Sequence, residues 1–167
     1  MADILFTIEK YVIVMNFLVF LLMAPHARMA LSSFVSVTFL LLMNAIMFWC
    51  EIYLKQLYGS FPDIVRHTWF FVFGALELVC IAFIYRFHIM FGIQPSTTSK
   101  SIVNSFNLLL ICQAVAHFDR FIFKTEVILN FYSLLIPAIN ISIAIITVIT
   151  MLKLYFDKYS NKLQGAN

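Results

Sequence analysis

The sequence predicts an all-α fold, a bundle of transmembrane helices that crosses the membrane several times. The chain has 167 residues, of which 63% are hydrophobic and only 11% are charged. Soluble globular chains are about 45–50% apolar and about 25% charged, so this composition excludes a soluble domain, a disordered chain and a disulfide scaffold. The apolar residues also fall into runs of about 20, the length that crosses the hydrocarbon core of a bilayer.

Five spans are predicted from the positions of these runs, and polar breaks with Pro, Gly or charged residues separate them. The expected spans are residues 4–24, 29–50, 67–90, 102–118 and 127–152. The expected breaks are a mixed loop at 51–66, loops at 94–100 and 119–126, and a short polar tail at 153–167. We treat residues 1–167 as a single membrane domain. Because the fourth run is the shortest, a bundle of four spans is the alternative.

The first two spans occupy the N-terminal fifty residues. Residues 1–24 are like a signal peptide in ending with an apolar run, but a signal peptide begins with a positively charged segment. Here Asp3 and Glu9 outweigh Lys10, so we expect this segment to be kept as the first span. The second span, 29–50, has no charged residue.

The last three spans differ in polarity. The third contains a carboxyl group, Glu77, near its middle, and the fourth contains Asn104, Asn107 and Gln113. The fifth is the longest apolar run. Trp and Tyr residues gather near the span ends, as in the aromatic belts of membrane proteins. Lysines and arginines divide five against six between the two sides of a five-span bundle, so the positive-inside rule does not set its orientation.

Glu77 is the most informative single residue. A charged carboxylate at the middle of a membrane helix costs about 2.5 to 3.5 kcal/mol on insertion scales, so such a group needs partners or a proton. Two interpretations follow. Glu77 is either a site for a proton or a cation, or a hydrogen-bonded carboxyl group that holds helices together.

The other four spans each bring a side-chain amide toward the depth of Glu77. When the span midpoints are aligned at the bilayer centre, Asn140 lies level with Glu77 and Asn16 lies close to that level. Asn44 and Gln113 lie about a turn away. Amides in hydrocarbon seek partners on neighbouring helices. The sequence therefore predicts one buried polar layer in which Glu77, Asn140 and Asn16 lie close together.

The fifth span carries small or polar residues along one side. They are Asn130, Ser133, Pro137, Asn140, Ala144 and Thr147, spaced 3, 4, 3, 4 and 3 residues apart. This spacing places them on one helix face, and membrane helices turn such a face away from lipid. We interpret this stripe as a packing seam, within the chain or between copies, or as the wall of a pore.

Four histidines could hold a haem between two imidazoles, as in membrane cytochromes. In a five-span bundle His26 and His88 fall on one side, and His67 and His117 fall on the other. All four lie at span ends, and His67 and His88 are roughly 31 Å apart along a helix. A haem protein is therefore a remote alternative, and we expect no cofactor and no metal.

Signatures of enzymes and of nucleic-acid binding are missing from the sequence. It contains no H-E-x-x-H, no G-x-S-x-G and no glycine-rich phosphate loop, so we expect no enzyme. The basic residues are spread singly, which is not the pattern of a nucleic-acid interface. Cys50, Cys80 and Cys112 are far apart and form no C-x-x-C pair, so they indicate neither a redox pair nor a zinc site.

These observations favour a non-catalytic subunit, an anchor, sensor or scaffold in an assembly of the bacterial inner membrane such as a defence or envelope machine. We expect it to contact lipid and to form a homo-oligomer or bind a partner protein, with the stripe of the fifth span as the contact. The bacterial source is inferred from the compactness of the chain. The alternative is a small ion channel or proton-coupled transporter that uses Glu77.

Overall fold

Five α-helices account for most of the part of the chain that the structure describes. This computed structural model describes the backbone of residues 2–124 and 127–164, and the side chains of residues 11–124, 131–132 and 134–160. The elements in order are α1 (Ala2–Met23), the 3-10 turn η1 (Ala24–His26), α2 (Leu31–Tyr58), α3 (Pro62–Met90), α4 (Thr97–Phe118), the π-helical turn η2 (Asp119–Phe123) and α5 (Val127–Gln164). No strand occurs among the described residues, which confirms the predicted all-α class.

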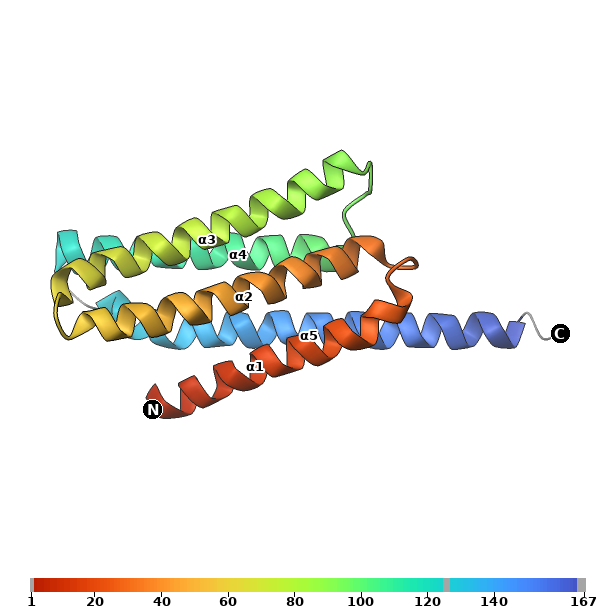
Figure 1. The fold of residues 1–167 in the computed structure, drawn as a ribbon, viewed down its shortest axis with the longest axis horizontal. Helices are drawn as coiled ribbons and strands as arrows, with labels where there is room; N and C mark the ends of the chain where they lie inside the picture. The colour runs from red at the N-terminus through yellow and green to blue at the C-terminus, as the bar shows by residue number, and fades with distance from the viewer. Residues whose placement is uncertain (1, 125–126, 165–167) are drawn as a thin grey trace.

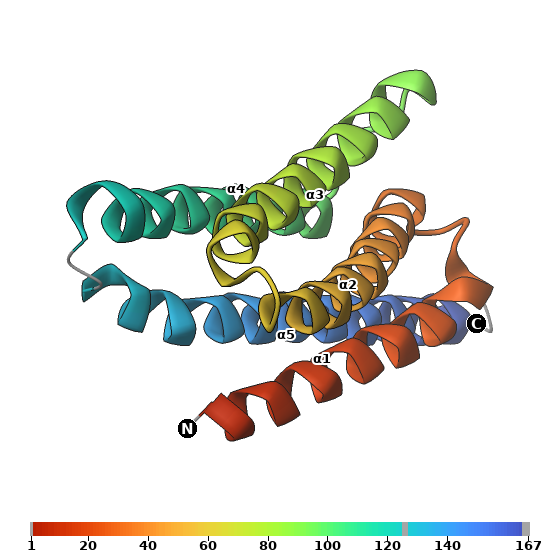
Figure 2. The ribbon, with the colours of Figure 1, turned by 60° about the vertical axis from the view of Figure 1, so that its left-hand side comes forward.

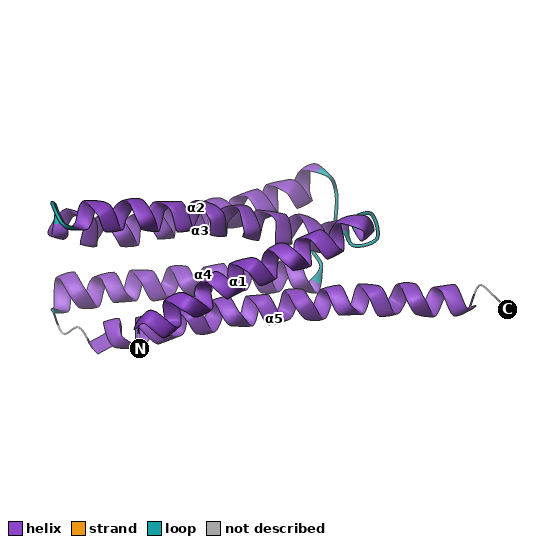
Figure 3. Ribbon diagram, turned by 60° about the horizontal axis from the view of Figure 1, so that its bottom comes forward, coloured by secondary structure: helices purple, strands orange, loops and turns teal. Residues whose placement is uncertain are grey.

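The helices form a bundle in which α4 contacts three of the other four helices. α4 packs against α2, α3 and α5, while α1 packs against α5 and α2. Figure 3 shows α2 and α3 above α4 and α5, with α1 crossing on the side of α5. In Figure 2, α3 and α4 lie together on the side of α5 opposite to α1. The helix neighbours of each polar side chain follow from this arrangement.

The outer surface of the bundle is apolar, as a membrane requires. Four helices are long and apolar enough to cross a bilayer, and a shorter apolar stretch covers Tyr11–His26. Large apolar side chains such as Phe71 and Ile149 point outward, whereas Val37 and Phe106 belong to the buried core. The chain is therefore a multi-pass membrane protein with four or five spans.

The predicted loop at 51–66 is wrong, because most of it is helical. α2 continues to Tyr58 and α3 begins at Pro62, so residues 59–61 alone connect them. The apolar run ends before this segment, but its inward face continues through the buried side chain of Leu54. Proline is favoured at the first position of a helix, where a backbone N–H would have no partner. The polar composition located the turn but overestimated its length.

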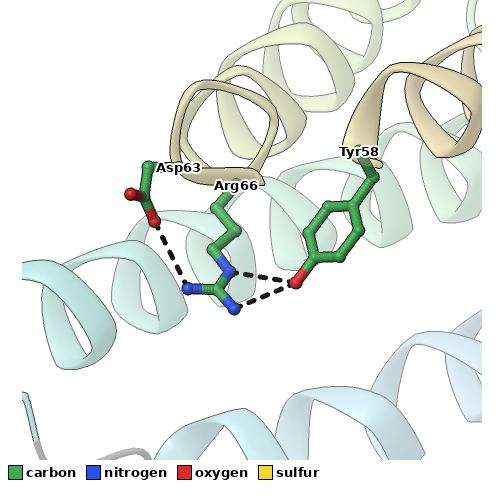
Figure 4. A network of polar contacts seen from close by, with 3 residues as sticks. All are labelled: Tyr58, Asp63 and Arg66. Atoms are coloured by element: carbon green, nitrogen blue, oxygen red, sulfur yellow. Dashed lines mark hydrogen bonds and ion pairs between the residues drawn. The ribbon is translucent and has the colours of Figure 1, made fainter. Parts of the chain in front are cut away.

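Arg66 links the two helices on the outside of this turn (Figure 4). Its Nη2 and Nε donate to Tyr58 Oη over 2.9 and 3.2 Å, and its Nη1 lies 3.4 Å from Asp63 Oδ1. Exposed ion pairs of this kind contribute little to stability, because water solvates both charges well. The contacts therefore orient the start of α3 more than they stabilise it.

The predicted loops at 94–100 and 119–126 are also shorter than expected. α4 begins at Thr97, inside the first predicted loop. In the second, α4 continues directly into η2, which ends at Phe123 and has Lys124 as its C-cap. Lys124 has a φ of 55°, a left-handed conformation that cannot continue a right-handed helix.

The predicted polar tail is helical through Gln164, because α5 runs to that residue and projects past the other helices (Figure 1). The last part of the predicted tail, 165–167, lies outside the described residues. Tyr155 anchors the start of this extension on α1: its Oη donates to Leu22 O over 3.2 Å. Its ring also meets the ring of His26 edge-on, with 4.9 Å between their centroids. No glycine or proline follows until Gly165, so nothing in the sequence ends the helix earlier.

Serine side chains join α2 to the start of α4. Ser96 Oγ accepts a hydrogen bond from Ser99 N over 3.1 Å and so caps α4. The same oxygen accepts from Ser33 Oγ over 2.9 Å, and Ser96 N donates to Ser32 Oγ over 2.8 Å. One residue in the connection to α4 thus holds the N-terminus of α2 as well.

His88 extends these contacts to the end of α3. Its Nδ1 lies 2.7 Å from Ile84 O, and since a carbonyl only accepts, Nδ1 is the donor. The Nε2 of a neutral ring is then an acceptor, so Ser32 Oγ donates to it over 2.8 Å. Ser32 therefore connects three helices through one hydroxyl group.

Replacing Ser96 with alanine should lower the stability of the fold by about 1 kcal/mol, the usual cost of losing an N-cap. Thermal unfolding in detergent, followed by circular dichroism, measures this loss. Ser60→Ala, at an exposed residue of the 59–61 turn, is the matched control and should leave the midpoint unchanged. Equal midpoints for the two variants would contradict the role given to Ser96.

Candidate functional site

The carboxyl group of Glu77 lies inside the bundle between α3 and α4. The side chains of Glu77 and Gln113 are 2% and 3% exposed. Gln113 Nε2 donates to Glu77 Oε1 over 2.5 Å. Gly74, one turn earlier on α3, also faces α4: a Cβ there would make ordinary van der Waals contacts, 3.4 Å from Leu110 Cδ1 and 3.5 Å from Gln113 Oε1. A close helix–helix contact thus brings the acid and the amide together.

Two oxygens of this pair, Glu77 Oε2 and Gln113 Oε1, have no hydrogen-bond partner among the residues that the structure describes. Both are acceptors, so neither can serve the other while the carboxyl group is ionised. A protonated carboxyl group could donate from Oε2 to Gln113 Oε1, and the pair would then have two hydrogen bonds. The arrangement therefore offers one place for a proton inside the bundle.

A second polar contact joins α1 to α5. Thr147 Oγ1 lies 3.2 Å from Asn16 Oδ1 and 2.8 Å from Ala144 O on its own helix, while Asn16 Nδ2 has no partner. A hydroxyl group has one proton and cannot donate to both oxygens at once. Turning the amide over would let Asn16 Nδ2 donate to Thr147 Oγ1 while the hydroxyl donates to Ala144 O. Either way, the contact links the two helices.

Among the described residues, no hydrogen bond joins Glu77, Asn140 and Asn16 to one another, so their predicted single layer stays a prediction. Glu77 pairs with an amide of α4, and Asn16 pairs with a hydroxyl group of α5. Asn140 and Asn44 are half-buried, and neither side chain makes a hydrogen bond to a residue that the structure describes. Aligned span midpoints gave the depth of each group, but they did not say which helices are neighbours.

The stripe on the fifth span faces the inside of the chain. Pro137, Ala144 and Thr147 are buried and Asn140 is half-buried, while the side chains of Asn130 and Ser133 lie outside those that the structure describes. α5 packs against α1 and α4, and Thr147 makes its contact with α1. In the described part, the stripe is a packing seam within one chain.

The four histidines lie in two groups at opposite ends of the bundle. Both ring nitrogens of His88 are engaged in hydrogen bonds, and His26 packs against a tyrosine of α5. The rings of His67 and His117 have centroids 5.5 Å apart, and Phe121 stacks on His67 at 3.5 Å. These close ring contacts fill the space between the side chains. Within the described residues, no group of three or more His, Cys, Asp or Glu side chains could hold a metal ion.

A cavity of about 310 Å³ opens at the end of the bundle that carries the 59–61 turn. Its walls include Lys55, Arg66, Trp69, Phe70 and Arg120. Lys55 and Arg66 each form an ion pair with an acidic residue on their own helix. Acidic residues of the protein thus partly balance the positive charge of the cavity, so this charge does not indicate an anionic ligand.

Sequence reasoning missed the serine contacts and a buried acid. The cap formed by Ser96 has a recognisable signal, a serine just before an apolar run, that favours a helix start at 97. Asp119 is 3% exposed although it falls in a predicted loop, and no sequence pattern marks it as buried. Comparison with models of protein families, with curated proteins and with solved structures gives no match for this chain.

Gln113→Leu should destabilise the protein by roughly 1–3 kcal/mol, because it leaves a buried carboxyl group with no partner. Glu77→Gln should cost less, since two amides can still pair. Replacing both residues with leucine should recover much of the loss, because the unpartnered group is gone as well.

Unfolding in mixed micelles as the fraction of denaturing detergent rises gives these free energies. Asn44→Leu is the control, because this amide makes no hydrogen bond to a described residue. If Gln113→Leu costs no more than Asn44→Leu, the pair does not hold α3 against α4.

Thr147→Val should cost roughly 0.6 to 2 kcal/mol, the value of a hydrogen bond between membrane helices. Thr38→Val is matched to it, because Thr38 Oγ1 donates only to Phe34 O on its own helix, over 2.8 Å. The same unfolding assay compares the two variants. A loss as large in Thr38→Val as in Thr147→Val would show that the contact with α1 adds nothing.

Proposed function

We propose that this protein is a non-catalytic integral membrane subunit, an anchor, sensor or scaffold within an oligomeric assembly of the bacterial inner membrane. The observation that carries the proposal is the enclosure of Glu77. Its side chain is 2% exposed and its described partner is an amide of the same chain. A carboxyl group placed in this way fastens two helices together.

The other buried polar groups support the same role. A transport pathway needs polar groups that line a continuous route through the membrane. In the described part of this chain the polar groups inside the spans are instead used in separate contacts between neighbouring helices, and the serine and histidine contacts lie at one end of the bundle. Besides the contacts of Glu77 and Asn16, Thr98 Oγ1 and Thr150 Oγ1 lie 2.6 Å apart and join α4 to α5. This distribution favours a rigid scaffold.

The short connection between α2 and α3 and the apolar outer surface favour a subunit over a protein that works alone. The connection between α2 and α3 is three residues long, 59–61, and offers little surface outside the membrane. Most of the exposed side chains on the spans are large and apolar, which suits contact with lipid or with other membrane helices. The bacterial inner membrane is proposed from this compactness.

A second candidate function is a small channel or a proton-coupled transporter. The unpartnered oxygens Glu77 Oε2 and Gln113 Oε1 favour it, because they offer a place where a proton could bind and leave. Exchange with water would require the contact between α3 and α4 to open.

Purified protein in liposomes should carry no proton or cation current above that of empty liposomes. The expectation follows from the enclosure of Glu77, and it should hold equally for Glu77→Gln. A pH-sensitive dye inside the vesicles, with an imposed pH gradient and potential, makes the measurement. A known protonophore added at the end shows that the vesicles are sealed.

The transport alternative makes the opposite prediction for the same vesicles. Flux in the wild type that disappears in Glu77→Gln would establish Glu77 as a transport site and overturn the proposal of a non-catalytic scaffold. Flux that survives the substitution would also overturn it, and would place the pathway elsewhere.

A further inference from the structure

The outward side of α4 carries polar residues at the depth of the hydrocarbon core. The residues of this side, called here the α4 outer stripe, are Asn104, Asn107, Ile111, Ala114 and Phe118, and all five are exposed. Asn107 is near the middle of the 22-residue helix, about 15 Å from its start, and Asn104 is one turn closer to that start. The span formed by Thr97–Phe123 has its midpoint at residue 110, so Asn107 lies about 4.5 Å and Asn104 about 9 Å from the centre. Both distances are less than half the hydrocarbon thickness, which is about 15 Å.

These two amides make no side-chain hydrogen bond to any residue that the structure describes. Other polar side chains at the surface of the spans find a partner on their own helix: Ser142 Oγ donates to Ala138 O over 2.8 Å. An amide in hydrocarbon with no partner is unfavourable, because lipid tails offer neither donors nor acceptors. The α4 outer stripe is therefore incomplete within one chain.

We propose that the α4 outer stripe binds the same stripe of a second copy of this chain, with the two α4 helices parallel. The proposal rests on the proposed function as a membrane subunit and names the surface through which it assembles. Copies inserted in the same orientation are related by a two-fold axis along the membrane normal. Such an axis places each residue of α4 near its own counterpart.

The chemistry of the stripe fits a second copy. An amide carries both donors and an acceptor, so two asparagines that face each other across a two-fold axis can satisfy each other. The residues are spaced 3, 4, 3 and 4 apart, which is the repeat of left-handed coiled coils. In parallel coiled coils an asparagine in the core fixes the register and the number of strands. Ala114 is small and lets two helices approach closely.

The residues beyond the stripe agree with this geometry. One turn before Asn104, the exposed Lys100 lies near the polar end of α4. Two facing lysines would repel in hydrocarbon, but at this position their long side chains can extend into water. A different protein at this surface would need polar groups at the depths of both Asn104 and Asn107. A second copy of this chain has them at these depths by symmetry.

Disulfide cross-linking in membranes tests which helix faces the second copy. In a chain whose three cysteines are replaced with alanine, Ile111→Cys should form a covalent dimer on mild oxidation. Leu78→Cys is the control, because Leu78 is exposed on α3 next to Glu77 and so lies at a similar depth. Cross-linking at position 78 but not at 111, or at neither position, would overturn the proposal.

The mass of the particle, with native cysteines kept, tests the role of the amides. In nanodiscs the wild type should contain two copies, and Asn104→Leu/Asn107→Leu should weaken the dimer about tenfold or more. Ser142→Leu, which also replaces an exposed polar residue of a span, should leave the dimer intact. The double variant removes polar groups from a lipid-facing surface, so it should insert and fold.

The outcomes separate this inference from the proposed function. A wild type with one copy per particle, or a dimer that the double variant keeps, overturns the α4 interface, whereas the flux measurement decides the proposed function independently. If a different protein cross-links to position 111 in native membranes, the proposal that a second copy binds the α4 outer stripe is also overturned. That result would leave the role of a subunit in place.

Discussion

The hydrocarbon core contains no water, and this single constraint governs how the chain is assembled. A polar side chain there is stabilised by another protein group or is left without a partner. Apolar side chains do not favour one helix neighbour in the same way, because contact with lipid is about as favourable for them as contact with another helix. The pairing of helices is therefore set by close packing and by a few hydrogen bonds. Among the described residues, those between spans include Glu77 with Gln113, Asn16 with Thr147, Thr98 with Thr150, and Ser32 with His88.

α4 packs against three other helices, and polar contacts join it to each of them. Its N-terminus is held by serines of α2, its first turn contacts α5, and its C-terminal half receives Glu77 of α3. A helix with so many polar residues would be a poor membrane span in isolation. The neighbouring helices supply hydrogen-bond partners, which lipid does not. The same reasoning explains why Gln113 is buried, whereas Asn104 and Asn107, on the opposite side, make no side-chain hydrogen bond to a described residue.

Much of the fold could be predicted from composition and from the lengths of the apolar runs. The bundle follows from them, whereas the helix ends do not, because polar residues on the outer face of a helix resemble a loop. Loop 51–66 was misassigned for this reason, although the inward position of Leu54 continues the pattern of α2. Within the site, the depth of Glu77 could be predicted but its partner could not. Helix order along the chain does not say that α3 packs against α4 and α1 against α5.

The stripe on the fifth span shows why the direction of a polar face is easier to predict than its partner. Small and polar residues at helical spacing indicated a face turned away from lipid, and the described members Ala144 and Thr147 do lie inside. The same pattern fits a seam with another copy equally well, and in this chain α1 already covers it. A contact between copies then has to use a polar surface that no helix of the chain covers. Among the described spans the two asparagines of α4 meet that condition, since their amides lie in the membrane and make no hydrogen bond within the described chain.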